Sequence, residues 1–496
     1  MASPQHTRGG LSAALYRPLS DADVRAVANA ALEVLSRSGM AVYADTAFEA
    51  FRAAGADADE STRVVRLPRG LVEDAVASNP SSVTLYSRDG EHDVVLAGTH
   101  VHYGTGGTAL YVLDDDGRRR KALVPDVVLN ARLVDALDNI HLHTINVFPH
   151  DVADIDAIDV NRFYHSLNHT AKHVMGGVYS LEGCRKVVEM AAMIAGSAAA
   201  LRERPFVSFI TLIISPFKVD GRYGEMCCYL AGEGLPVVVP TEPICGTTSP
   251  ITLAGNVLTH VAETLGGIAM IQTVRRGAPG ICGSVGSTPD LATMNHLGGP
   301  IERAMINAAV AQVIQHFDLP LYSTAGTTDA KAVNAQAGWE SGMSSLLVAM
   351  SGANYIHDAA GLMEADLTVA YEKLAIDNEI LGMVQRVLRG IEVNDETLAT
   401  DLIIAKGPGK DYLIEDHTLR HMRDEFYMPT LANRRKRQDL EKDDDAVARA
   451  RRFVDRIRTA PPVERLDPTV RQAVLARFGE ILPAAGAARR AAAVTV

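Results

Sequence analysis

Cysteines, aromatic residues and long apolar runs are scarce in this chain, and each scarcity excludes a class of protein. The five cysteines are odd in number and show no CxxC spacing, which argues against a disulfide framework and a structural zinc site. We therefore predict reduced, buried thiols in a cytoplasmic protein. The first residues lack the apolar core of a signal peptide, and apolar runs break before about 18 residues, so neither a signal peptide nor a membrane span is expected.

An excess of positive charge and the common nucleotide and hydrolase motifs are absent too. The formal net charge is −12, which makes DNA or RNA an unlikely main partner for the chain. No Walker loop, GxSxG elbow, kinase signature or HExxH motif is present. His141 and His143 lie two residues apart on one expected strand, but no third ligand accompanies them. We therefore expect no bound metal.

A rhythm of short apolar runs and helix-length gaps fills the middle of the 496-residue chain. Most runs end in Gly, Pro, Thr, Ser, Asn, Asp or His. The runs cover residues 102–108, 140–148, 174–179, 206–215, 235–243, 280–287, 319–326 and 354–362. Strands that alternate with helices form parallel sheets, and about eight such units predict a (β/α)₈ barrel with its chemistry at the carboxyl ends of the strands.

The sequence around this rhythm predicts two additions to the barrel. Residues 1–98 read as an α+β lead-in, and residues 99–392 hold the catalytic barrel. Residues 393–496 form a helical extension, whose Ala- and Arg-rich tail after Gly486 is expected to fray.

Two strand ends carry side chains that suit chemistry, and a third is rich in glycine. Glu242 follows the run 235–243, where a carboxylate either contacts a substrate or ties down its own loop. His357 follows a later run and can donate a hydrogen bond to a ligand or serve as a structural residue. The segment 104–108 has glycines that either allow a turn or let a large flat ligand approach closely.

Three long segments resemble the trimethylamine methyltransferase family. They are residues 241–256 (TEPICGTTSPITLAGN), 322–341 (YSTAGTTDAKAVNAQAGWES) and 355–364 (YIHDAAGLME), and the resemblance spans roughly residues 15–435. It implies a (β/α)₈ barrel that moves a methyl group from an amine to the Co(I) of a separate corrinoid protein. No cobalamin is then expected to bind tightly to this chain itself.

The resemblance also narrows the set of amines that are expected as the methyl donor. The archetype that acts on trimethylamine carries pyrrolysine in its barrel, whereas this chain contains only the twenty standard residues. It is thus more similar to glycine betaine methyltransferase and its relatives without pyrrolysine. A quaternary amine such as a betaine is the expected donor, and trimethylamine or another methylamine is the alternative.

The resemblance gives the candidate residues their roles. Glu242 is expected to orient the substrate, and His357 is expected to bind a substrate carboxylate. Aromatic walls suit a cation that loses its charge in the transition state, because a tight carboxylate grip would stabilise the ground state. The candidates for these walls are Tyr103, Phe148, Phe209, Trp339 and Tyr355, and the candidates for giving the corrin ring room are Gly104, Gly106, Gly107 and Thr108.

Two other function classes stay open at this point. The barrel could bind a betaine or a corrinoid without catalysis, or it could be an unrelated lyase or decarboxylase that uses Lys331 as a Schiff base. Symmetric assemblies are common among soluble enzymes, so a homo-oligomer is expected.

Overall fold

Eight parallel strands form the centre of the protein. The computed structural model describes residues 10–439 and 444–484. Each of the eight apolar runs contains or overlaps one of the strands, namely β7 (His100–Thr105), β10 (His143–Thr144), β11 (Val174–Gly177), β12 (Val207–Ile210), β14 (Val237–Thr241), β15 (Gly280–Ser284), β18 (Leu321–Thr324) and β19 (Tyr355–Ala360). Their order in the sheet is β7-β19-β18-β15-β14-β12-β11-β10, with a short antiparallel strand β1 (Leu11–Ser12) beside β7. The predicted α/β class is confirmed.

The two end strands of this series, β7 and β10, also approach each other. Isolated parallel bridges join Gly104 to Leu142 and Ala109 to Val147. The His141 N–H donates to the Tyr103 carbonyl at 2.7 Å. The contact between these strands consists of separate bridges, whereas the other neighbours form ladders, with a register shift between Ile356 and Ala360 in the ladder of β7 and β19.

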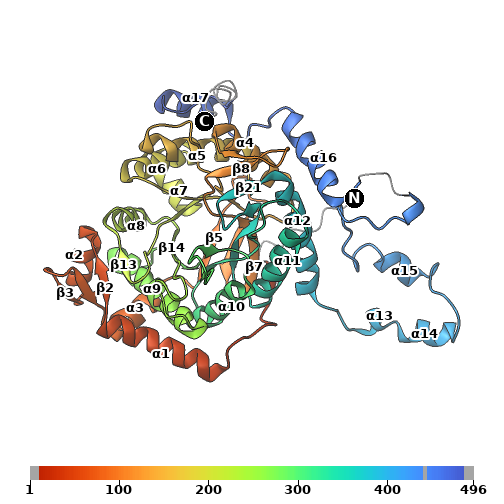
Figure 1. Ribbon diagram of the computed structural model, residues 1–496, viewed down its shortest axis with the longest axis horizontal. Coiled ribbons are helices and arrows are strands. Elements are labelled where there is room, and N and C mark those ends of the chain that lie inside the picture. The colour runs from red at the N-terminus through yellow and green to blue at the C-terminus, as the bar shows by residue number, and fades with distance from the viewer. Residues whose placement is uncertain (1–9, 440–443, 485–496) are drawn as a thin grey trace.

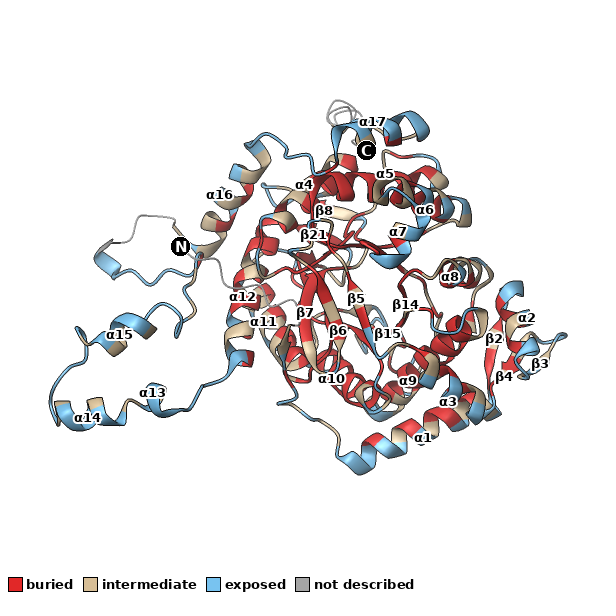
Figure 2. Cartoon of the chain, turned by 180° about the vertical axis from the view of Figure 1, so that it is seen from behind, coloured by how far each residue is buried: buried red, intermediate tan, exposed pale blue. Residues whose placement is uncertain are grey.

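Helices surround the strands on the outside (Figure 1). They are α4 (Val124–Asp135), α5 (Ile155–His169), α6 (Leu181–Ala195), α7 (Ala198–Glu203), α8 (Gly221–Glu233), α9 (Leu253–Val274), α10 (Ile301–His316), α11 (Ala335–Met350) and α12 (Tyr371–Arg389). Short strands decorate the loops: β8 (Tyr111–Leu113), β9 (Arg119–Lys121), β13 (Lys218–Val219), β16 (Thr288–Pro289), β17 (His296–Leu297), β20 (Leu362–Met363) and β21 (Thr368–Ala370). Figure 2 shows that buried residues concentrate in the strands and in the helix faces turned toward them.

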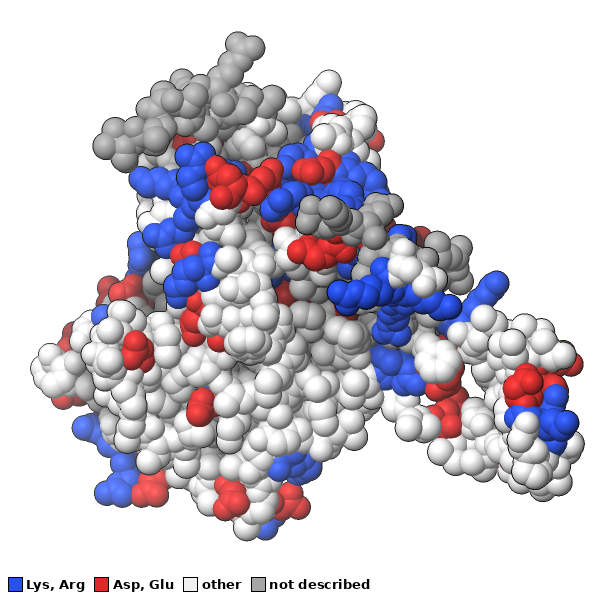
Figure 3. Space-filling view, turned by 45° about the vertical axis from the view of Figure 1, so that its right-hand side comes forward, with Lys and Arg blue, Asp and Glu red and all other residues white. Residues whose placement is uncertain are grey.

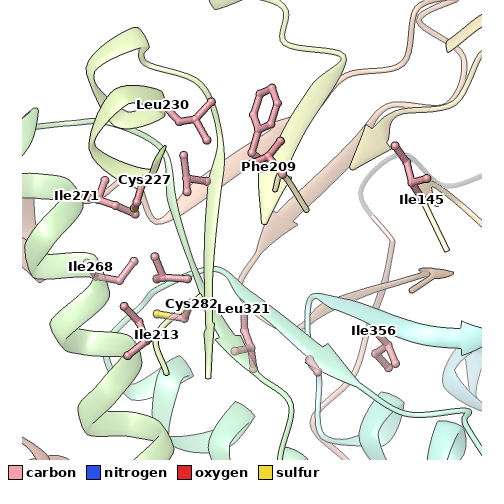
Figure 4. Close-up of a cluster of buried hydrophobic side chains, with 14 of the residues drawn as sticks. Ile145, Phe209, Ile213, Cys227, Leu230, Ile268, Ile271, Cys282, Leu321 and Ile356 are labelled. Carbon is pink, nitrogen blue, oxygen red and sulfur yellow. The ribbon is translucent and has the colours of Figure 1, made fainter. Parts of the chain in front are cut away.

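The strands bury both of their faces, as strands of a parallel sheet do. In β14, Val237 and Val239 join the large core under the helices, whereas Val238 joins a second core with the opposite strand faces. Figure 4 shows the large core, in which Phe209 and Cys282 of the strands meet Leu230 and Ile271 of the helices. The second core is completed by a hairpin of β5 (Ser82–Leu85) and β6 (Val94–Ala97).

The N-terminal segment is a mixture of helices and short strands that packs on the outside of the sheet. It contains α1 (Asp21–Arg37), α2 (Asp45–Ala53) and α3 (Arg69–Ser78), with β2 (Met40–Val42), β3 (Asp57–Asp59) and β4 (Val64–Arg66). Ser20 and Asp23 form a capping box at the start of α1. Helices α1 and α3 both pack against α9.

The C-terminal extension is helical where the structure describes it. It contains α13 (Asp395–Leu398), α14 (Thr400–Lys406), α15 (Asp416–His421), a 3₁₀ turn η1 (Arg437–Asp439), α16 (Ala446–Thr459) and α17 (Pro468–Arg477). Helix α16 packs on α12 and α4, and α17 packs on α6. The tail after Gly486, for which fraying is predicted, lies outside the described residues.

Helix α9 is the element that bears on the expectation of no membrane span. By length and composition it is able to cross a membrane, and it alone among the described residues meets that test. However, 83% of its most apolar window is buried inside the protein, where the helix packs against β14, β15 and five other helices. A helix that is enclosed by protein on all sides needs apolar residues all round, which explains its composition.

Close packing at Gly104 leads to the first prediction. A Cβ at this position would lie 2.1 Å from the Tyr355 hydroxyl. We expect Gly104→Ala to destabilise the protein by about 1–3 kcal/mol, since overpacking a filled core costs that much. The measurement is the denaturant midpoint of the purified chain.

Gly232→Ala is the matched control. Gly232 lies in α8, and a Cβ there would meet nothing within 4 Å. Alanine is the better helix former by about 1 kcal/mol, so this variant should keep or raise the midpoint. Equal midpoints for the two alanine variants would contradict the packing argument.

Candidate active site

The carboxyl ends of β14, β18 and β19 lie at the same edge of the sheet. Glu242, Tyr322 and His357 come from these three strands or directly follow them. Side chains alternate along a strand, so Tyr322 and Tyr355 share the inner core with Val238. His357 follows Tyr355 by two residues, and Glu242 follows Val238 by four residues. Because side chains alternate, His357 and Glu242 are placed on that same inner side. The rings of Tyr322 and His357 stack with centroids 3.9 Å apart.

A chain of charged groups links the loops at this edge. His296, which follows β15, lies 3.3 Å from Glu242 through Nδ1 and 3.2 Å from Asp366 through Nε2. Ser287 also contacts the His296 Nδ1 atom, at 2.6 Å. Arg303 of α10 donates from Nη2 to Asp366 at 3.0 Å, and Thr327 donates to the other carboxylate oxygen of Asp366.

Glu242 differs from its neighbours because solvent reaches it. Its side chain is 44% exposed, whereas those of Arg303 and Asp366 are 3% and 19% exposed. Desolvation raises the pKa of Glu242, and His296 and Arg303 oppose that rise. Burial would also raise the pKa of Asp366, but Arg303, His296 and Thr327 lower that pKa overall. The network therefore contains one fixed anion, Asp366, and one accessible carboxylate, Glu242.

His357 and Asp358 form a buried pair. His357 Nδ1 lies 2.7 Å from the Ser323 carbonyl, which can only accept, so Nδ1 carries a hydrogen. His357 Nε2 lies 2.9 Å from Asp358 Oδ2, and Thr324 donates to the same oxygen. Asp358 Oδ1 is buried and has no hydrogen-bond partner among the described residues.

Several acidic residues at this edge lie in backbone with positive φ angles. Asp358 has a φ of +59°, and the consecutive residues Glu364, Ala365 and Asp366 have φ values of +54°, +53° and +67°. Each such non-glycine residue costs on the order of 1 kcal/mol or more. The ion pairs of Glu364 with Arg119 (2.8 Å) and of Asp366 with Arg303 (3.0 Å) hold this turn in place.

Comparison with known proteins identifies the family. The sequence profile described as "Trimethylamine methyltransferase (MTTB)" matches residues 6–478. The chain belongs to the trimethylamine methyltransferase family. This membership confirms the resemblance and the enzyme class that the motifs predict.

The relatives in the family carry two kinds of name. Trimethylamine methyltransferase MttB of Desulfitobacterium hafniense (strain DSM 10664 / DCB-2) is 36% identical over 82% of this chain and 81% of its own length. Glycine betaine methyltransferase of D. hafniense (strain Y51) is 31% identical over 84% and 87%. MttB of Methanosarcina barkeri (strain Fusaro / DSM 804) is 34% identical over 79% and 80%. Among solved structures, M. barkeri monomethylamine methyltransferase (MtmB) matches with a TM-score of 0.49 at 14% identity, over 91% and 96%.

Three of the predicted aromatic walls lie inside the protein, away from the edge. Tyr103 and Phe209 are fully buried in the core under the helices, and Phe209 stacks on Phe163 of α5. Tyr355 faces inward but is fully buried, and its hydroxyl bonds Thr144 at 2.6 Å. None of the three fits the predicted substrate role, because an apolar run does not reveal which face of a strand each residue takes.

The other two predicted aromatic residues have different positions. Phe148 is half-buried and packs edge-on against His150 and Tyr179, near the ends of β10 and β11. Trp339 lies near the start of α11 with 57% of its surface exposed. Phe148 and Trp339 both stay predictions for the substrate wall. Tyr322, which the prediction omitted, is buried and stacks on His357 beside the acidic groups.

Close contacts inside the protein leave no room for a side chain at the glycines of the segment 104–108. A Cβ on Gly106 would lie 2.2 Å from Asp358 Oδ1, and one on Gly107 would lie 3.0 Å from Leu362. Thr108 accepts a hydrogen bond from Arg162 at 3.1 Å. These contacts, together with the packing at Gly104, explain the small residues without a corrin ring.

Among the described residues, the cysteines and the two fully buried lysines, Lys172 and Lys373, are not free to act as nucleophiles. All five cysteines are buried, and burial raises their pKa values, to about 12 for Cys227 and Cys282. Burial lowers the pKa of Lys172 to about 8, but its ammonium donates to the carbonyls of Val134, Leu137 and Ile140. Lys172 precedes β11, so it lies at the opposite end of the strands. Lys373 lies near the end of β18, and its ammonium donates to the Gly326 carbonyl, Ser341 and Asp377 at 2.7–2.9 Å.

One group of potential metal ligands exists among the described residues, far along the chain in the extension. It consists of Glu396, His417 and His421, whose ligand atoms lie within 4.8 Å of one another. Arg420 already pairs with the Glu396 carboxylate at 2.7 Å. We interpret the group as an ion-pair network that ties α13 to α15.

A buried glutamate supports the loop before the site and gives a pH prediction. Glu263 of α9 accepts hydrogen bonds from Ser215 and the Phe217 N–H, both at 2.7 Å. Burial raises its pKa to about 7 from 4.5. The folded protein thus holds this proton more tightly than the unfolded chain. This contribution to stability is fully present below pH 4.5 and is lost as pH rises toward 7.

Glu263→Gln should remove that pH dependence. We expect the free energy of unfolding of the native chain to fall, relative to this variant, by up to about 1.4 kcal/mol per pH unit between pH 4.5 and 7. Urea titrations of both proteins at several pH values measure the difference. Parallel curves across the window would contradict a raised pKa at Glu263.

Proposed function

We propose that this protein transfers a methyl group from a quaternary amine to the Co(I) of a corrinoid held by a separate protein. Family membership and the accessible Glu242 at an edge without a protein nucleophile support the proposal together. In this reaction the reduced cobalt supplies the electron pair, and the amine leaves uncharged. The protein then needs to position the donor, and no side chain has to attack it.

The proposal includes a closed barrel. The bridges between β7 and β10 support closure of the eight strands into a ring, with the β5–β6 hairpin filling its amino-terminal end. The carboxyl ends of the strands then form a rim that remains open to a large co-substrate. Glu242 and His296 lie at this rim, and Tyr322 is buried below it in the inner core.

The charges at the rim suit a cationic donor that becomes neutral. Glu242 attracts the ammonium group, while its contact with His296 weakens that attraction. A carboxylate without such a partner would stabilise the bound substrate more than the transition state. Phe148, the half-buried aromatic residue near the ends of β10 and β11, is the candidate for an aromatic face, and a cation–π contact contributes about 0.5–2 kcal/mol.

The betaine class is the donor that we favour. A quaternary ammonium leaves as a neutral amine at any pH, whereas a tertiary amine must carry a proton when it is attacked. Only twenty standard residues are present, and a relative named glycine betaine methyltransferase is 31% identical. Relatives named trimethylamine methyltransferase make methylamines the second candidate.

The predicted role of His357 needs revision within this proposal. Both of its ring nitrogens already have partners, so it would have to break a hydrogen bond to bind a substrate carboxylate. We propose that it positions Tyr322 by stacking. We place the protein in the cytoplasm, where a reduced corrinoid partner would be present.

The donor is tested by direct methyl transfer. The purified chain is incubated without oxygen with cob(I)alamin and, separately, glycine betaine, carnitine, proline betaine, choline and trimethylamine. We expect the absorbance of methylcobalamin to appear with at least one betaine. Appearance with trimethylamine alone would replace the proposed donor, and no transfer from any amine, together with tight betaine binding by calorimetry, would favour the non-catalytic barrel.

A Schiff-base lyase would give a different result in the same preparation. Lys331 is exposed, and its ammonium donates to the Asp329 carbonyl at 2.6 Å. Borohydride trapping of a carbonyl substrate at Lys331, without methyl transfer, would support that alternative.

Glu242→Gln tests the role of the accessible carboxylate. Loss of one charge contact to the cation should lower kcat/KM about tenfold or more, with most of the change in KM, because Glu242 binds the donor before reaction. Glu302→Gln is the matched control, since Glu302 is an exposed residue in the first turn of α10. Equal kcat/KM values for both variants and the native chain would remove Glu242 from the binding site.

A further inference from the structure

A long segment of the C-terminal extension has no core of its own. We call residues 391–428 the arm; it leaves α12 at Gly390 and contains α13, α14 and α15. None of these three helices contains a buried residue. The arm projects outward beyond α12, away from the strands (Figures 1 and 2).

The arm nevertheless has a defined shape. Glu396 of α13 pairs with Arg420 and His421 at 2.7 and 3.1 Å, and Lys406 pairs with Glu415. Within the described residues, the hydrogen bonds and ion pairs of residues 391–424 are all made inside the arm. Helices of four to seven residues are marginal in water by themselves, so another surface is needed to stabilise this arrangement.

The base of the arm is firmly attached to the body. Arg386 of α12 pairs with Glu425 at 2.8 Å, and Arg389 donates to the Glu425 carbonyl. The Glu379 carboxylate accepts from the N–H groups of residues 430–432 at 2.6–2.7 Å. The direction of the arm is therefore set at both ends.

The exposed side of the arm is apolar. Its large exposed hydrophobic residues are Ile391, Val393, Leu398, Ile403, Ile404, Tyr412, Leu413, Ile414, Leu419, Met422, Phe426 and Met428. An apolar surface of this extent on a single chain marks an interaction site. The arm is longer than the 20–30 residues that each side contributes to a standard protein interface.

A second exposed apolar surface lies on the body of the same chain. Trp339 and Met343 stand one turn apart on α11, and Met383 and Val387 stand one turn apart on α12. Helices α11 and α12 pack side by side. We call these four residues the α11–α12 face.

We propose that the arm of one copy binds the α11–α12 face of a second copy, in a two-fold dimer that exchanges arms. A two-fold axis covers both surfaces of both chains with a single type of contact. The apolar character suits a permanent partner, because transient interfaces are about as polar as the rest of a surface. A methyl acceptor must leave after each turnover, so it is the weaker candidate.

Charge supports a second copy as the occupant. In the arm, Asp and Glu outnumber Lys and Arg, whereas the exposed run Arg434, Arg435, Lys436 and Arg437 follows its base. Figure 3 shows Lys and Arg side chains gathered between the body and a projecting segment. A second copy therefore carries both an apolar face and a basic run whose charge is opposite to that of the arm.

Trp339 supplies the measurement, because it is the only tryptophan of the chain. Light scattering after size exclusion should give twice the mass of the chain. On dilution below the dissociation constant, the emission of Trp339 should move to longer wavelength as its indole becomes exposed. Mass and emission should change over the same concentration range.

Paired substitutions test both surfaces of the contact. The arm variant Ile404→Asp with Ile414→Asp, and the face variant Met343→Asp, should each raise the dissociation constant at least about tenfold. Val463→Asp is the control, since Val463 is similarly exposed but lies after α16. All these residues are exposed, so circular dichroism should show unchanged helix content.

Several outcomes would overturn the proposal. A monomer at micromolar concentration with the emission of an exposed indole would do so, as would a dimer that both variants leave intact. A shift of Trp339 emission only after addition of a corrinoid protein would assign the surfaces to that partner. These results are independent of the methyl-transfer assay, because none of the changed residues lies at the strand ends.

Discussion

The loops at the candidate site are organised around one buried cation, Arg303. Its guanidinium donates to the carbonyls of Gly286 and Gly298 and to the carboxylate of Asp366. Burial of such a charge is costly unless every donor has an acceptor, so the loops after β15 and β20 must converge on it. Asp366 in turn fixes His296, and His296 fixes the charge environment of Glu242. The accessible carboxylate thus depends on a group that no substrate touches.

This arrangement is consistent with catalysis by position. The cysteines are buried with raised pKa values, and the buried Lys172 has all its donors occupied at the opposite end of the strands. The ion pairs of Glu364 and Asp366 hold the turn at 364–366 in its strained backbone conformation. A site built in this way holds a charged donor in place, and it leaves bond formation to a second reactant.

The arm and the site place different demands on the same fold. The site needs an open edge at the strand ends, while the arm needs an apolar partner surface on the outside of α11 and α12. Trp339 illustrates the difference: it belongs to a family motif, yet more than half of its surface is exposed. In the proposed dimer, the arm of the second copy covers this exposed surface.

The sequence by itself determined the strands, the helices between them and the family. Apolar runs, glycine and proline breaks and three long motifs are local properties, and each of the eight runs contains or overlaps a strand. It also placed Glu242 and His357 at strand ends. Tyr103 and Phe209 could not be assigned correctly, because a run buried on both faces has no alternation that shows which side chains point inward.

Only the tertiary structure decided which distant groups meet. Arg303 lies within a helix and Asp366 follows an irregular turn, so no spacing along the chain brings them to 3.0 Å from each other. His296 could be noticed in the sequence as a histidine that follows a predicted strand. Its bridge between Glu242 and Asp366, however, depends on three separate loops. Contacts between remote segments arise from the packing of the strands and helices, whereas local sequence determines only what each segment becomes.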